Sequence, residues 1–432
     1  MGQTFSPGMD SFCEIFAPDT QVLVTNNHFF EKMVVSLALD GFASEEGIQR
    51  VLKNNFGKQL SIGKISQIMN RAADYAAEFD ASIDLSGIRQ GANDEIFQCG
   101  LPVLTGIDPV STYIYLLQQE KDRSAPTWQA AMETCKARNL NLDVSISDCG
   151  AGLLSGIPKA FPDAIIQPDL FHWLMELGKE ISSQERKAYS LLSDYYRYRD
   201  ALNGQRLHEK TFQKLLAVEE KLLPALNRCD TLLILYEWLK EMTRCNGYDR
   251  RDVVSLCGWI LERMEETAGE SSGRLSQALS KTRKNLPGIL VYLERTEKAL
   301  RDYALEHGYP GEAFVLLYKL PGYGFGSGKY RAADRRLRHM LKNAYADSYL
   351  KVQEILDGVK RASSLVENLN GRLRPYMNLK RMVPEKFLTL LKVYFNTKRY
   401  RRSRKAERVG KSPLELLTGQ KHEDFYDIVC GR

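Results

Sequence analysis

Apolar positions follow two different periods along the chain, and the first of them is helical. Residues 29–82 carry apolar side chains every three or four positions, which predicts three short helices. Ser44 and Ser61 are typical N-cap residues for the second and third of these helices. With a glycine-containing turn before the last helix, the stretch is typical of a helix-turn-helix unit, preceded by an arm over residues 1–28. A plain three-helix bundle fits the same pattern, so both interpretations stay open.

The third predicted helix would carry a polar outer face. Its side chains are of the types that contact bases and phosphates in DNA complexes, namely Lys64, Gln67, Asn70 and Arg71. If the unit binds DNA, we expect these four residues to make the contact.

The period changes near Ile88, where strand-like runs begin. Glycine- and proline-containing turns separate the first runs, and a helix capped by Ser124 precedes the fourth. The expected strands cover residues 88–98, 103–107, 112–118, 142–148 and 164–166. Their order, β-β-β-α-β-α-β, is that of a ribonuclease H-like core with a mixed five-stranded sheet. The pattern therefore predicts an α+β or α/β fold.

A long helical stretch interrupts this core. Residues 174–328 have a helical pattern throughout, and they are too numerous for a loop, so they must form an all-α insertion. The glycine-rich segment 322–329 resembles a linker that returns the chain to the core. The core is then split into a first part, residues 83–173, and a second part, residues 329–432.

Charge is distributed unevenly along the chain. The net charge is only +6, yet residues 329–411 hold 23 Lys and Arg against 7 Asp and Glu. A basic block on a near-neutral protein indicates a polyanionic partner, most often a nucleic acid, although a solvated helical face is the simpler alternative. The densest part of the block contains Lys398, Arg399, Arg401 and Arg402. We expect these four side chains to contact DNA phosphates.

Composition excludes several other classes. No run approaches the roughly 18 apolar residues that a membrane span needs, and no secretory signal is visible at the N-terminus. The eight cysteines form no CxxC pair, which argues against a zinc ribbon and favours free thiols in a reducing cytosol.

Three acidic residues lie where predicted elements could bring them together. Transfer of a phosphodiester bond is commonly catalysed by two Mg²⁺ ions roughly 4 Å apart, which carboxylate oxygens hold. The candidates are Asp94 in the first strand, Asp148 at the end of the fourth strand and Glu367 on a late helix. Glu95 follows Asp94 directly, so in a regular strand only one of the two carboxylates can join the cluster.

The segments around these residues resemble the motifs of bacterial insertion-sequence transposases of the DDE type, named after two aspartates and a glutamate. Residues 93–97 and 102–108 are similar to their first strand and hairpin, and residues 147–153 to their second-aspartate motif. Residues 363–370 are similar to the helix that carries their glutamate. The three motifs occur in the family's order, and the resemblance runs from about Phe29 to Gly419.

The resemblance implies roles for individual residues. Asp94, Asp148 and Glu367 would bind two Mg²⁺ ions, with Mn²⁺ as a possible substitute, and Arg374 would contact a phosphate near the scissile bond. Asp108 matches a position that is usually structural. In the segment Asp169-Leu170-Phe171-His172, the histidine would position the scissile phosphate or the leaving group, or it would simply pack at a domain junction.

The inserted helical domain holds two further candidates. In related enzymes an aromatic side chain of such an insertion stacks on a flipped base. Trp238 and Trp259 are available for this role, but both lie in apolar stripes, which favours core packing.

The implied function is metal-dependent cleavage and transfer of DNA strands at the ends of a mobile element. The partners would be double-stranded DNA, from transposon ends and target, and further copies of the chain in a homodimer or higher oligomer. No membrane is involved, and the expected location is the bacterial cytoplasm, in association with the nucleoid. Alternatives are a ribonuclease H-like nuclease without strand transfer, or a non-catalytic DNA-binding regulator derived from a transposase.

Overall fold

The computed structural model describes residues 25–148, 150–202, 209–244, 247, 250–269, 273–361, 364–379 and 382–431. The chain divides into two compact units. The first comprises residues 1–82, 375–397 and 421–432, and the second comprises residues 83–374 and 398–420.

The first unit contains the three helices that the N-terminal periodicity predicts. They are α2 (Asn27–Leu39), α3 (Glu45–Phe56) and α4 (Ile62–Ala81). Ser44 and Ser61 cap α3 and α4, since their hydroxyl oxygens accept hydrogen bonds from the backbone N–H groups of Gly47 and Lys64. Both N-caps were expected from the sequence.

Two late helices complete this unit, and this differs from the expected boundaries. α16 (Glu385–Thr397) packs against α4, where the buried Lys392 ammonium lies 2.9 Å from a carboxylate oxygen of Asp80. α18 (Phe425–Cys430) packs against α2 and α4. Residues 329–432 therefore do not all belong to the second part of the core. Their apolar faces cover helices that lie more than 300 positions earlier in the sequence.

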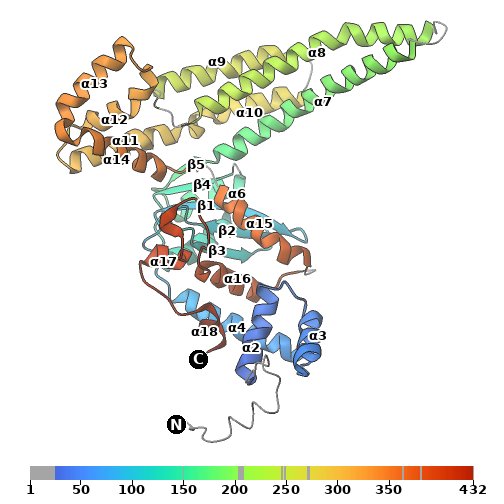
Figure 1. The fold of residues 1–432 in the computed structure, drawn as a ribbon, viewed down its shortest axis with the longest axis vertical. Helices are drawn as coiled ribbons and strands as arrows, with labels where there is room; N and C mark the ends of the chain where they lie inside the picture. The colour runs from blue at the N-terminus through green and yellow to red at the C-terminus, as the bar shows by residue number, and fades with distance from the viewer. Residues whose placement is uncertain are drawn as a thin grey trace, which may run out of the picture. The chain divides into compact units, whose positions relative to one another are not determined.

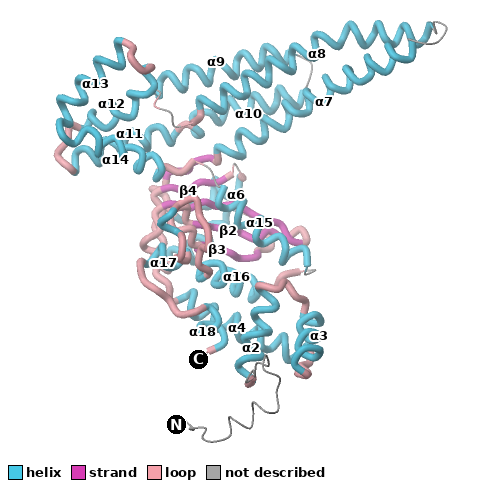
Figure 2. Tube along the Cα trace, in the orientation of Figure 1, coloured by secondary structure: helices cyan, strands magenta, loops and turns pink. Residues whose placement is uncertain are grey.

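The second unit is built on one mixed five-stranded sheet, as the strand pattern predicts. Its order is β3-β2-β1-β4-β5, with β1 antiparallel to β2 and parallel to β4. Figure 2 shows the strands as one magenta layer. Their bounds are β1 Gln90–Gln98, β2 Leu101–Ile107, β3 Ile114–Gln119, β4 Val144–Ser147 and β5 Ile165–Pro168.

Helices α5 (Ala125–Lys136) and α6 (Ala151–Ala160) flank β4 in the sequence and pack tightly on each other. A Cβ atom on Gly156 would lie 2.7 Å from the Cβ of the fully buried Trp128, so glycine allows the close approach of the two helices. This packing positions the start of α6 at Ala151, three residues after Asp148.

The described residues of the insertion form helices joined by short connections (Figure 1). They pack around two cores, the first formed by α7 to α10 with the start of α11, and the second by the end of α11 with η2 and α12 to α14. The bounds are α7 Leu170–Leu202, α8 Glu209–Met242, α9 Arg250–Ala268, α10 Gly273–Ile289, α11 Val291–Glu306, α12 Gly311–Lys319, η2 Leu320–Tyr323, α13 Gly328–Leu341, η3 Lys342–Ala344 and α14 Tyr345–Gly358.

The structure thus places the end of the insertion later than the sequence pattern suggested. α13 and α14 share a core with α11 and α12, so the helical region continues to Gly358 rather than to residue 328. The glycine-rich segment 322–329 is not the return linker, because it connects α12 to α13 within the insertion. After α14 the chain continues to α15 (Ser364–Leu379), η4 (Ala406–Arg408) and α17 (Pro413–Thr418).

The expectation of core packing for Trp238 and Trp259 is wrong. Their rings stack on each other with centroids 6.4 Å apart, and the two residues are 51% and 45% exposed. The inner stripes of α8 and α9 are formed instead by smaller residues, including Leu235, Leu239 and Cys257. Within the described part of the chain, no helix combines the length and the apolar character needed to cross a membrane.

Candidate metal centre

The register of β1 and β4 places Asp94 beside Asp148. The parallel pairing of the two strands ends at the pair Asn93 and Ser147, and the two aspartates are the next residue on each strand. One carboxylate oxygen of Asp148 accepts a hydrogen bond from the backbone N–H of Gly150 at 2.9 Å. The carboxyl end of β4 therefore carries two carboxylates on neighbouring strands.

Asp94 is buried, and both of its carboxylate oxygens have hydrogen-bond partners. Oδ1 accepts from the backbone N–H of Glu95 at 2.8 Å, and Oδ2 accepts from the side-chain amide of Asn370 at 3.0 Å. Asn370 lies on α15, one turn after Glu367. The same helix thus supplies the third carboxylate and a group that orients the first one.

His172 connects the start of the insertion to α15. Its Nε2 atom lies 3.1 Å from a carboxylate oxygen of Glu367, and its Nδ1 atom lies 3.2 Å from a carboxylate oxygen of Asp169. Asp169 is buried and caps α7 by accepting hydrogen bonds from the backbone N–H groups of Phe171 and His172. Asp169 therefore positions the imidazole of His172 in the first turn of α7, within the segment 169–172 that the sequence singles out.

Two sets of side chains are close enough to hold a metal ion among the described residues. In each set the ligand atoms lie within 4.8 Å of one another. One set contains Asp94, His172 and Glu367, and the other contains Asp94, Glu95 and Asp148. Asp94 belongs to both sets, so its carboxylate lies between two potential sites.

The inclusion of Glu95 contradicts the expectation that only one of the adjacent carboxylates can join the cluster. Beyond Asn93, β1 has no pairing with β4 in the described register, so the side chains of Asp94 and Glu95 can both approach Asp148 around this free edge. Glu95 is held by the indole N–H of Trp128 at 3.0 Å and by Arg123 at 3.6 Å.

Crowding of acidic groups changes the protonation of the cluster. Burial, reinforced by the charges of Asp148 and Glu367, raises the pKa of Asp94 to about 6, although its hydrogen bond with Glu95 N–H and the nearby His172 act in the opposite direction. The carboxylate of Asp169, 3.2 Å from Nδ1, raises the pKa of His172 to about 9, with the charges of Asp94 and Glu367 adding to the effect. Burial also raises the pKa of Glu95. Asp94 therefore keeps its proton to higher pH than an ordinary aspartate does, and a cation bound at its carboxylate would compete with that proton.

An open pocket of about 510 Å³ adjoins Glu95, one of the carboxylates of the cluster. Glu95 and Gly150 form part of its lining, together with Arg123, whose guanidinium lies 5.4 Å from the ring centroid of the exposed Phe97. Gly152 allows α6 to approach Arg123 closely, because a Cβ atom at this position would lie 1.9 Å from the carbonyl oxygen of Arg123.

Two other acidic or basic candidates stand apart from the cluster. Arg374 lies two turns after Glu367 on α15 with an exposed side chain, and no contact described in the structure joins it to the carboxylates. Asp108 is buried in the turn between β2 and β3, where it accepts hydrogen bonds from the backbone N–H groups of Val110 and Ser111. The structure thus gives Asp108 the structural role that was expected.

The four residues expected to form a DNA-contacting face on α4 are all exposed, namely Lys64, Gln67, Asn70 and Arg71. Arg71 already has a partner, since its guanidinium lies 2.5 Å from a carboxylate oxygen of Glu31 on α2. The remaining three side chains form the outer face of α4 as predicted.

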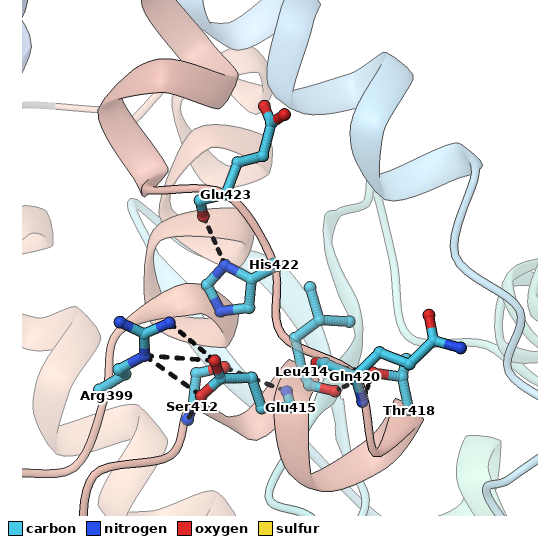
Figure 3. A network of polar contacts seen from close by, with 8 residues as sticks. All are labelled: Arg399, Ser412, Leu414, Glu415, Thr418, Gln420, His422 and Glu423. Carbon is cyan, nitrogen blue, oxygen red and sulfur yellow. Dashed lines mark hydrogen bonds and ion pairs between the residues drawn. The ribbon is translucent and has the colours of Figure 1, made fainter.

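The basic segment after α16 has a mixed character. Lys398, Arg401 and Arg402 are exposed, but Arg399 binds the buried Glu415 through two guanidinium nitrogens, the shorter distance being 2.7 Å (Figure 3). Glu415 in turn caps α17, because its carboxylate accepts a hydrogen bond from the backbone N–H of Ser412. Arg399 therefore has a structural partner in addition to any contact with DNA.

The sequence interpretation gives two residues of the centre no role, although Asn370 shares a helix face with Glu367 and Arg374 in the sequence pattern. Glu95 was set aside by strand alternation, which fails at the free edge of β1. Asn370 shares a helix face with Glu367 at a spacing of three residues, and this signal could have included it.

Comparison with known families gives one match. Residues 111–246 match the family model described as Transposase, Mutator family. The match covers less than a third of the chain and includes Asp148 and His172, but neither Asp94 nor Glu367. No curated protein matches the sequence. The family match supports a transposase, an enzyme class that cleaves and transfers DNA.

Proposed function

We propose that this protein is a DDE-type transposase that binds the ends of an insertion sequence and catalyses metal-dependent cleavage and transfer of DNA strands. The observation that carries the proposal is the convergence of Asp94, Asp148 and Glu367, which come from separate elements, with the histidine His172 beside them. The strand order and the long helical insertion support a split ribonuclease H-like core.

The donor set fits divalent magnesium. Three carboxylates provide the hard oxygen ligands that Mg²⁺ prefers, and Asp94 lies within reach of both Asp148 and Glu367, which suits a pair of ions. Asp94, Asp148 and Glu367 would hold them. When bound, such ions stabilise the charge that develops on the scissile phosphate and lower the pKa of an attacking water or 3′-hydroxyl.

The chain's own groups would orient this reaction. Asn370 holds the carboxylate of Asp94 in place through its side-chain amide, and Glu95 is restrained by Trp128. His172, protonated at neutral pH by its contact with Asp169, would donate a hydrogen bond to a phosphate oxygen or a proton to the leaving 3′-oxygen. The outer face of α4, in a helix-turn-helix unit, would recognise the DNA ends.

The test is Mg²⁺-dependent cleavage of a duplex that carries the element's own ends, with the unmodified protein and Asp148→Asn compared. We expect cleavage and strand joining by the unmodified protein, and loss of both in the variant while DNA binding persists. Cleavage without joining would favour a ribonuclease H-like nuclease. Equal behaviour of the two proteins, or DNA binding without cleavage by either, would favour the regulator and exclude the mechanism proposed.

A further inference from the structure

The turn between α12 and α13 exposes an aromatic side chain to an unusual degree. Phe325 is 91% exposed, more than any other large hydrophobic residue among those that the structure describes as exposed. A lone aromatic in water gains nothing for folding, because it remains outside any core. Either the exposure of Phe325 has no function, or the ring contacts a ligand.

The turn that carries Phe325 is well defined by hydrogen bonds. Gly324 and Gly326 on either side have φ values of 74° and 75°, a backbone conformation that favours glycine. Ser327 donates its hydroxyl to the carbonyl of Tyr323, and its Oγ accepts from the backbone N–H of Tyr330, which caps α13. A hydrogen-bonded turn therefore carries Phe325 at the surface. Its ring makes an edge-on contact with the ring of Tyr330, with the two centroids 5.1 Å apart.

The helix that follows is strongly basic on its outer side. α13 buries Ala333, Leu337 and Leu341 against the second core of the insertion. Its exposed cations are Lys329, Arg331, Arg335, Arg336 and Arg338, and its one acidic residue is Asp334. Arg338 is bound to Asp334 at 2.9 Å, which leaves the other four cations in excess of the helix's acidic charge.

Positive charge beside an outward aromatic matches the chemistry of duplex DNA. Arginine and lysine side chains neutralise phosphates along the backbone, and an apolar wedge can enter between base pairs where a protein bends or opens the duplex. An apolar protein partner would instead require a contiguous hydrophobic patch, whereas Phe325 is followed by a row of cations.

We propose that α13 and the turn around Phe325 form a second DNA-binding surface on the insertion. Lys329, Arg331, Arg335 and Arg336 contact phosphates of double-stranded DNA, and Phe325 inserts into the base stack. The inference rests on the proposed function only in that DNA is assumed to be the ligand of this surface. It is independent of the carboxylates and of metal, so it can be tested in a protein that does not cleave.

The first experiment measures the salt dependence of binding in the full-length Asp148→Asn protein, with a short linear duplex of mixed sequence as the probe. Neutralising Arg331, Arg335 and Arg336 to Gln removes up to three phosphate contacts, so the slope of log K against log salt should decrease by about 2–3. A matched triple of exposed cations on other helices, Arg274, Lys284 and Lys298 to Gln, should leave the slope unchanged. Equal slopes for the two triples would overturn the proposal.

The second experiment tests the wedge. A duplex with 2-aminopurine reports unstacking as an increase in fluorescence, which we expect with Phe325 present and not with Phe325→Ala. Leu305→Ala, which truncates another highly exposed apolar side chain, is the control and should retain the signal. An unchanged signal in Phe325→Ala, or equal competition by single-stranded DNA, excludes insertion into a duplex.

The outcomes separate this surface from the catalytic proposal. If the slope and fluorescence change as expected while the unmodified protein fails to cleave with Mg²⁺, the surface stands and the transposase mechanism does not. If cleavage occurs but the α13 variants behave as their controls, only the surface is excluded. Absence of any binding to the duplex excludes both.

Discussion

The Nε2 atom of His172 lies 3.1 Å from a carboxylate oxygen of Glu367, although the two residues are separated by the whole helical insertion. His172 is in the first turn of α7, where the insertion begins, and Glu367 is on α15, after the chain has returned from it. The two ends of the insertion therefore meet at the candidate metal centre. A domain of this size can be inserted there only if its first and last residues stay close together.

Asn370 provides a test of how the centre is organised. Asn370→Ala removes the hydrogen bond to Asp94, and we expect Mg²⁺-dependent cleavage to decrease by roughly 10- to 100-fold, as for other groups that orient metal ligands. DNA binding should be unchanged. Asn368→Ala, an exposed position on the same helix, is the control and should retain full activity. Activity of Asn370→Ala equal to that of the control would exclude the positioning role.

The raised pKa of Asp94 predicts how metal binding depends on pH. Its pKa is about 6 in the folded protein against an ordinary value of 3.8, so the folded state favours the protonated acid. The corresponding contribution to stability is present below about 3.8 and is lost as pH rises through about 6. A cation must displace this proton, so Mg²⁺ should raise the melting temperature more above pH 6 than below it. Melting curves with and without Mg²⁺ measure the difference, which Asp94→Asn should abolish.

His172 should titrate far above an ordinary histidine. Its pKa of about 9 arises first from its contact with the carboxylate of Asp169. Because the folded pKa is raised, the protonated imidazole stabilises the fold fully below about 6.5, and this contribution is lost as pH rises through about 9. Proton NMR of the metal-free protein gives the titration directly.

Asp169→Asn is the matched variant for His172. We expect it to lower the pKa of His172 and to move any decline in cleavage at high pH to lower pH. If His172 only packs at the domain junction, the pH dependence of cleavage should be the same in Asp169→Asn and in the unmodified protein.

Gly152 tests the packing of α6, which begins three residues after Asp148. A Cβ atom at this position would lie 1.9 Å from the backbone carbonyl oxygen of Arg123, so Gly152→Ala should destabilise the protein by about 1–3 kcal/mol and reduce cleavage. Gly258→Ala on α9 has open space around its Cβ and should stabilise its helix by up to about 1 kcal/mol. Thermal denaturation of both variants distinguishes the two effects. A stable Gly152→Ala would mean that α6 can shift without cost.

Arg399 and Arg401 separate a structural role from a DNA-binding one. Arg399→Gln leaves the buried carboxylate of Glu415 without its cation, and we expect a loss of about 1 kcal/mol, limited because Arg399 is half exposed. Arg401→Gln should leave stability unchanged and weaken binding to DNA at low salt. Melting curves and salt titrations of the two variants provide the comparison. Equal losses of stability would contradict the assignment of Arg399 to the fold.

The sequence by itself determined most of the helices and strands of this protein and predicted its acidic candidates. The strands, the capped helices α3 and α4, and the acidic candidates were readable because hydrophobic period, N-caps and turn residues act over a few neighbouring positions. The insertion was also visible, since a helical pattern of that length has no other interpretation.

Only the tertiary structure decided which of these groups meet. The end of the β1–β4 pairing brings Glu95 beside Asp148, and the return of α15 brings Asn370 to Asp94. Likewise, α16 and α18 joined the N-terminal helices, and Trp238 and Trp259 remained exposed. The physical reason is that burial and register depend on surfaces that come from distant parts of the chain, and a local pattern does not specify its partner.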